Sequence, residues 1–90
     1  MHIIIPEMRD VQACAKVYIE AYKTAPWNEV YETAEIETCI GNYLNSDVKC
    51  CFALVENDEI KGVALGLVVP SISGPYLRIE DFCVDSNVQM

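Results

Sequence analysis

The residues able to do chemistry in this 90-residue chain are unevenly supplied, and histidine is the scarcest of them. His2, beside the N-terminus, is the single histidine. A serine or cysteine nucleophile generally works beside a histidine base, so Ser-His-Asp and Cys-His catalysis are excluded. The five cysteines show no C-x-x-C spacing and have no well-placed histidine to join them, so we expect no metal site.

The cysteines are placed instead like small core residues. Cys14 and Cys39 fall on the apolar faces of two expected helices, and Cys83 lies within an apolar strand. Free cysteine behaves in this way in a reducing compartment. No apolar run approaches the roughly 20 residues of a membrane span, and the N-terminus lacks the pattern of a signal peptide. We therefore expect a cytoplasmic protein without a membrane partner.

Carboxylates dominate the charged residues. Fourteen acidic residues face six basic ones, for a formal net charge of -8. This balance argues against a nucleic-acid partner, because such binding depends on Lys and Arg contacts to phosphate. An acidic surface is compatible with a cationic substrate such as an amine, and the alternative is that the charges only solvate helix faces.

Apolar spacing predicts six elements in a single α+β domain over residues 1–90. Residues 9–23 and 33–44 show the i, i+3, i+4 spacing of amphipathic helices, with Thr33 as the N-cap of the second. Strands are expected at 2–5, 50–55, 60–69 and 76–85, with a hairpin turn at 56–59. The order is β-α-α-β-β-β, which predicts an antiparallel sheet with both helices packed on it.

One predicted strand is apolar on both of its faces. Residues 63–69 carry no polar side chain, and such a strand has to be covered on both sides. Two helices can cover only one face of so small a sheet. We therefore expect something else to cover the other face.

The segment from Ile79 to Gln89 resembles the fourth strand, and the turn after it, of the GNAT superfamily of N-acetyltransferases. It reads Ile-Glu-Asp-Phe-Cys-Val-Asp-Ser-Asn-Val-Gln, and in that family an apolar-x-Val-Asp stretch leads into a pyrophosphate-binding motif, Q/R-x-x-G-x-G/A. Residues 52–55 and 60–64 resemble the second and third strands of the family, and residues 17–22 the end of its first helix. The resemblance implies a partial GNAT fold, the N-terminal portion of the domain.

The resemblance also implies how acetyl-CoA would be held. Main-chain groups of Phe82 and Val84 would pair with the pantetheine arm, and Gln89 would open the pyrophosphate motif. The glycines of that motif, which would form an anion-binding loop at a helix N-terminus, are not in the sequence, which reaches only Met90. We expect this chain to bind acetyl-CoA weakly or not at all and to be inactive by itself.

The resemblance further implies a carboxylate general base on the fourth strand and an acceptor pocket lined by the loop between the helices. Alternation places Glu80 with Arg78 and Phe82 on one face of that strand, and Asp81 on the other. Glu80 is the candidate base, the alternative being a structural carboxylate paired with Arg78. In the loop, Trp27 and Tyr31 are candidates for binding substrate, the alternative being a hydrophobic plug.

Two functions follow as hypotheses. In the first, the parent protein transfers acetyl from acetyl-CoA to a primary amine, and this chain is an incomplete part of it. In the second, the chain is a non-catalytic, self-associating α+β module that forms a homodimer through its last strand, whose edge would be exposed. A weaker third possibility is an unrelated acidic binding module.

Overall fold

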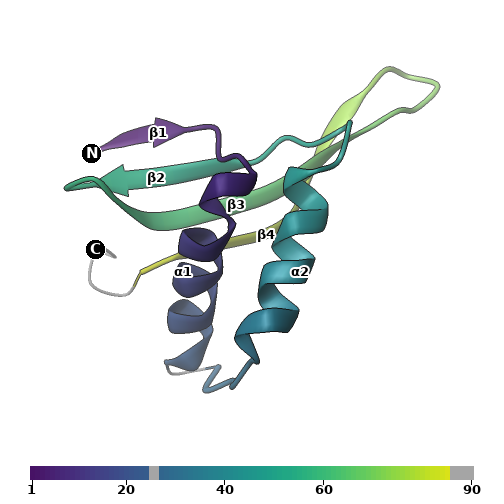
Figure 1. The fold of residues 1–90 in the computed structure, drawn as a ribbon. Coiled ribbons are helices and arrows are strands. Elements are labelled where there is room, and N and C mark those ends of the chain that lie inside the picture. The colour runs from purple at the N-terminus through teal and green to yellow at the C-terminus, as the bar shows by residue number, and fades with distance from the viewer. Residues whose placement is uncertain (25–26, 86–90) are drawn as a thin grey trace.

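The strands and helices follow the predicted order in a computed structural model that describes residues 1–24 and 27–85 (Figure 1). The elements are β1 (His2–Ile4), a 3-10 helix η1 (Met8–Asp10), α1 (Val11–Lys23), α2 (Thr33–Leu44), β2 (Phe52–Glu56), β3 (Glu59–Val69) and β4 (Tyr76–Val84). Within these residues the sheet has the order β1-β2-β3-β4, and every neighbouring pair is antiparallel. The predicted α+β class is confirmed.

The hairpin between β2 and β3 forms where a polar turn separates two apolar runs. Glu56 pairs with Glu59, so the loop contains only Asn57 and Asp58. Both have positive φ, 54° and 62°, as the tight hairpin turn that matches strand twist requires. Asn and Asp tolerate this conformation better than most residues do. The predicted hairpin is confirmed.

Both helices pack on one face of the sheet, where they form the core (Figure 1). α1 contacts β3 and β4, and α2 contacts α1 and β3. Cys14 and Ala15 of α1 are wholly buried, and these small side chains allow the helix to lie close to the strands. Ile40 of α2 and Leu65 of β3, each 1% exposed, fill the space between the layers.

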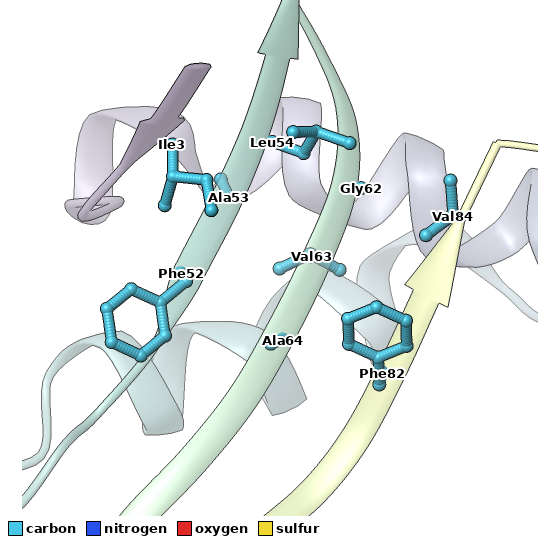
Figure 2. A pocket seen from close by; sticks show the side chains of 9 residues that line it. All are labelled: Ile3, Phe52, Ala53, Leu54, Gly62, Val63, Ala64, Phe82 and Val84. Atoms are coloured by element: carbon cyan, nitrogen blue, oxygen red, sulfur yellow. The ribbon is translucent and has the colours of Figure 1, made fainter. Parts of the chain in front are cut away.

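The opposite face of the sheet is apolar and is left open by the two helices. Ile3, Phe52 and Phe82 project from it and are 68%, 38% and 67% exposed. They border a shallow groove of about 150 Å³ that runs across the strands, with α1 and α2 behind the sheet (Figure 2). The prediction that the helices cover only one side of the third predicted strand is confirmed.

Two local predictions are wrong. Glu32, with extended backbone, is the N-cap of α2, and Thr33 is its first helical residue. Cys39 is exposed because the buried face of α2 follows Ile36 and Ile40 at a spacing of four. The buried face also includes Gly41 and Leu44, so Ile36 lies at its edge and Cys39 lies beyond that edge, on the flank of the helix.

A β-bulge in β4 has the largest consequence for the site. Leu65 pairs with Asp81 and Gly66 pairs with Ile79, so Glu80 is an extra residue with no partner in the ladder. Such a bulge bends a strand and redirects the side chains beyond it. A Cβ at Gly66 would lie 2.9 Å from the carbonyl oxygen of Cys50, so this close approach of three chain segments requires glycine.

Candidate functional site

The outer edge of β4 is the first part of the candidate site. Within the described residues β4 is the last strand of the sheet, and the N–H of Asp85 donates to the carbonyl of Lys61 at 2.7 Å. In an antiparallel ladder, residues that bond to the partner strand alternate with residues whose N–H and C=O point away. Asp85 bonds to β3, and so by alternation does Cys83. The residues between and before them, Val84 and Phe82, therefore have main-chain groups directed away from β3. This orientation is the one the resemblance requires of them.

The bulge changes which side chains of β4 share a face, and the predicted alternation is wrong. Asp81 lies opposite Leu65, whose side chain is in the core, so Asp81 faces the helices. Arg78 pairs with the residue two beyond Leu65 and therefore faces the same side. Phe82 points to the open face, as Figure 2 shows. The extra residue, Glu80, thus separates Arg78 from Phe82, which regular alternation would have placed together.

Glu80, the predicted base, is engaged by a cation. Its Oε1 lies 2.5 Å from Nε of Arg78, and the two side chains are 33% and 52% exposed. Burial, followed by the negative charge of Glu80, raises the pKa of Tyr43 in α2. The ion pair with Arg78, one of the alternatives for Glu80, is therefore present.

A cluster of aromatic side chains surrounds Asp81 where α1 ends. The hydroxyl of Tyr22 donates a hydrogen bond of 2.6 Å to Oδ1 of Asp81. The ring centroid of Tyr22 lies 4.7 Å from that of Tyr18, 5.3 Å from that of Trp27 and 6.4 Å from that of Tyr31. Tilted and edge-to-face pairs at such distances attract one another. We call Tyr18, Tyr22, Trp27 and Tyr31 the aromatic cluster.

Asp81 dominates the electrostatics of the aromatic cluster. Its hydrogen bond is the main cause that raises the pKa of Tyr22, and burial, followed by hydrogen bonding to Asp81, raises the pKa of Tyr18. Tyr31 donates instead to Glu29, which raises its pKa as well. The hydroxyls of the cluster are therefore neutral donors at physiological pH. In the part of the chain that the structure describes, no lysine or arginine forms an ion pair with Asp81.

A pocket of about 280 Å³ lies between the end of α1 and β4. Its lining comes from α1, from the loop that follows it and from the strand: Ala21, Tyr22, Trp27, Phe82, Cys83 and Val84. Two members of the aromatic cluster, Tyr22 and Trp27, therefore bound the pocket on one side, and β4 bounds it on the other. A ligand in this pocket would contact both halves of the candidate site.

The structure brings together some of the predicted site residues and separates others. Trp27 and Tyr31 both belong to the aromatic cluster, and Trp27 and Phe82 line the same pocket. Trp27 is 51% exposed, more than expected of a hydrophobic plug. Glu80 does not line this pocket. Gln89 lies outside the described residues.

Sequence reasoning missed Asp81, Tyr18 and Tyr22. The two tyrosines are four residues apart on α1 and therefore share a face, and they were assigned only to the apolar stripe of that helix. Two hydroxyl-bearing rings at this spacing are the signal that could have identified them. Alternation placed Asp81 on the face opposite Phe82, but nothing in the sequence paired it with Tyr22.

Burial removes two thiols from chemistry at neutral pH. It raises the pKa of Cys83 to about 12 and that of Cys14 to about 11, well above the ordinary 9.0. A cysteine attacks as the thiolate, and these thiols remain protonated. Across residues 1–24 and 27–85, no three His, Cys, Asp or Glu side chains gather where they could hold a metal ion. Neither helix in those residues is long and apolar enough to cross a membrane.

Comparison with known proteins identifies the fold. No family model matches the sequence, and no curated protein matches it. Among solved structures, a possible acetyltransferase from Clostridium difficile 630 matches 98% of this chain with a TM-score of 0.79 at 15% identity. A GNAT family acetyltransferase from Staphylococcus aureus matches 99% with a TM-score of 0.75 at 16% identity. An aminoglycoside acetyltransferase from an uncultured soil metagenomic sample, in complex with sisomicin, matches 98% with a TM-score of 0.64 at 15% identity.

These matches cover only part of the other proteins. The chain spans 59% of the length of the C. difficile protein, 67% of the S. aureus protein and 57% of the aminoglycoside acetyltransferase. The chain therefore has a partial GNAT acetyltransferase fold, as the resemblance implied. At this level of identity the similarity concerns the fold alone.

Proposed function

We propose that this chain is the acceptor-side part of an N-acetyltransferase that transfers acetyl from acetyl-CoA to a primary amine. The observation that carries the proposal is the fold match over 98% of the chain, combined with a pocket at the outer edge of β4. The outer edge of β4 and the pocket meet at Phe82. This is where an acetyl donor aligned along β4 would meet an acceptor.

The chain's own contribution to the donor is the main chain of β4. Backbone groups of Phe82 and Val84, directed away from β3, would pair with the pantetheine arm. The pyrophosphate of the donor needs N–H groups at a helix N-terminus. Both described helices pack in the core and precede β2 in the chain, so neither follows Gln89. We therefore expect acetyl-CoA to bind weakly or not at all until a glycine-rich loop is supplied after Gln89.

Acetyl transfer would be direct, within a ternary complex. The amine nitrogen attacks the thioester carbonyl carbon, the C–S bond breaks, CoA leaves as the thiol, and the amine loses a proton. Glu80 remains the proposed general base, acting through water, and Arg78 would hold its carboxylate in place. A covalent acyl-enzyme on Cys83 is disfavoured, because burial raises the pKa of that thiol to about 12.

The test compares residues 1–90 with the same chain continued through a Q-x-x-G-x-G/A loop and its helix. We expect the continued chain to release CoA when it is given acetyl-CoA and an amine, and residues 1–90 to release none. Glu80→Gln in the continued chain should lower kcat by about a hundredfold near neutral pH, with partial recovery at high pH where free amine is abundant. Loss of turnover in Cys83→Ala, with the fold intact, would contradict direct transfer.

A second candidate, self-association without catalysis, is favoured by a separate observation. The open face carries large apolar side chains, and three of those on β4 are exposed: Leu77 46%, Ile79 48% and Phe82 67%. Strand edges and apolar patches of this kind promote pairing between chains. We propose a homodimer that forms through β4. A cytoplasmic location stays a prediction.

A further inference from the structure

The face of the sheet turned away from the two helices, which we call the open face, is apolar on all four strands (Figure 2). We propose that two copies of this chain stack their open faces about a two-fold axis, with the Phe82 ring of each copy in the groove of the other. The inference rests on the self-association proposed above and identifies its surface. Pairing through β4 alone would bury one strand, whereas this packing also buries β1 and β2.

The composition of the open face is the first argument. All nine residues that line its groove are apolar. Leu77 and Ile79 extend this surface along β4. They pair with Val68 and Gly66 of β3, and both partners share a face with Ala64 by alternation. The chain as a whole carries a net charge of -8, so two copies repel one another through their acidic surfaces. They meet least repulsion where the uncharged open faces approach.

The area of the open face is the second argument, since a stable dimer needs about 600–1,000 Å² from each copy. The large apolar side chains of this face are exposed by between 37% and 68%: Ile3, Phe52, Val68, Leu77, Ile79 and Phe82. At roughly 200 Å² for a fully exposed large side chain, together they present on the order of 600 Å². Less exposed residues between them, such as Leu54 and Val84, add to that area. The open face therefore reaches the range of a homodimer interface.

The groove is the third argument, because it fits one aromatic ring. Ala64 lies at its floor, where it pairs with Phe52 on one side and with Phe82 on the other (Figure 2). Neighbouring strands are about 4.8 Å apart, so the main chains that carry the two phenylalanines are about 10 Å apart. An apolar cavity of about 150 Å³ holds a benzene-sized group. The groove has that volume, about 150 Å³.

Phe82 is the ring best placed to enter a neighbouring groove. It is more exposed than Phe52 and lies at the rim of its own groove (Figure 2). In a two-fold dimer each contact occurs twice, so Phe82 enters the partner's groove and the partner's Phe82 makes the same contact in return. The two rings then lie side by side, as aromatic pairs favour. Sheets that stack about 10 Å apart with interdigitating side chains have this geometry.

The experiment measures the dimer dissociation constant, Kd, of residues 1–90 by sedimentation equilibrium, with circular dichroism as the check on folding. Ile3→Lys and Phe52→Lys place a charge on β1 and β2, away from the edge of β4. Each should raise the Kd by about a hundredfold, because stacking would bury an unpaired ammonium. Val30→Lys is the matched control, since Val30 is 93% exposed and lies between α1 and α2. The Kd of this variant should change by less than about twofold.

Ala64→Leu separates ring insertion from general apolar association. The leucine would fill the groove while leaving the open face uncharged and more apolar. We expect the Kd to rise by about tenfold, because Phe82 of the partner subunit would no longer fit. Ala64 points into the groove (Figure 2), so the variant should fold. A Kd that stays the same or falls in Ala64→Leu would overturn the proposal.

The remaining outcomes separate this inference from the proposed functions. A dimer whose Kd is unchanged in Ile3→Lys and Phe52→Lys would overturn stacked faces and leave pairing along the edge of β4 in place. An unchanged chain that stays monomeric at high micromolar concentration would overturn both. The open face would then bind another occupant, such as a later segment of a longer chain. Acetyl transfer is tested separately, in the continued chain.

Discussion

Gly66→Ala should destabilise the chain because β3 has no room for a side chain beside the bulge of β4. The added Cβ would lie 2.9 Å from the carbonyl oxygen of Cys50 and 3.1 Å from that of Arg78. Both obstacles are backbone atoms. The first belongs to a residue that is itself bound to this glycine, since the N–H of Cys50 donates to the carbonyl of Gly66 at 2.9 Å. The clash therefore cannot be relieved by turning a side chain.

The size of the effect follows from these contacts. Overpacking a well-packed region costs about 1–3 kcal/mol, and two rigid backbone contacts place Gly66→Ala toward the upper half, at about 2 kcal/mol. In a domain of this size each kcal/mol lowers Tm by about 4–8 °C, so a fall of roughly 10–15 °C is expected. Urea unfolding followed by circular dichroism, at a fixed protein concentration, measures the free energy directly.

Gly41→Ala provides a control of opposite sign. Gly41 lies inside α2, and the nearest atom to a new Cβ is the flexible Cε of Met8 at 3.5 Å. Alanine is favoured over glycine in a helix by up to about 1 kcal/mol, so this variant should be as stable as the native chain or more stable. If Gly66→Ala matched Gly41→Ala in stability, the bulged register of β3 and β4 would be wrong, and with it the position of Asp81.

Three further predictions follow from the same structure. The chain should elute as a dimer in size-exclusion chromatography with light scattering. Ile79→Lys on β4 should make it monomeric, and Ile72→Lys in the exposed loop should not. A monomer of the unchanged chain at high micromolar concentration would contradict the dimer. The contribution of the two buried thiols to stability should be constant below pH 9 and should fall as pH rises toward about 11 and 12, because Cys14 and Cys83 keep their protons in the folded chain after the unfolded chain has lost them. Each pH unit in that window lowers the free energy of unfolding by up to about 1.4 kcal/mol per thiol. In urea titrations at several pH values, the free energy of unfolding should fall less steeply with pH for Cys14→Ala than for Cys39→Ala. Identical slopes of free energy against pH would contradict the argument. Calorimetry should show no acetyl-CoA binding to residues 1–90 at micromolar affinity, which is roughly 8 kcal/mol, and tighter binding would refute the need for a further loop.

Local signals predicted most of the fold. The hairpin turn at Asn57 and Asp58 depends on residue types that adopt positive φ. The helices were predicted from the spacing of apolar residues, and many of those residues form the core. The unbroken apolar run of β3 predicted that both faces of this strand are apolar and that the two helices cover only one of them. These features need little information from distant parts of the chain.

The site depended on a feature without a local signal. The bulge at Glu80 arises where Gly66, Cys50 and Arg78 approach one another, and nothing near Glu80 in the sequence marks it. Alternation therefore assigned Arg78 to the face of Phe82, whereas it lies on the face of Asp81. Trp27 and Tyr31 were predicted because the resemblance points to the loop between the helices, whereas Tyr18 and Tyr22 fall within the apolar spacing of the first helix.

The central claim is that this chain is the acceptor-side part of an acetyl-CoA-dependent acetyltransferase, and the nucleotide sequence that follows codon 90 in its gene tests it most directly. The account predicts an open frame in which Gln89 begins Q-x-x-G-x-G/A, followed by an amphipathic helix. A stop codon directly after Met90, or an open frame without glycines at those two positions, would contradict it.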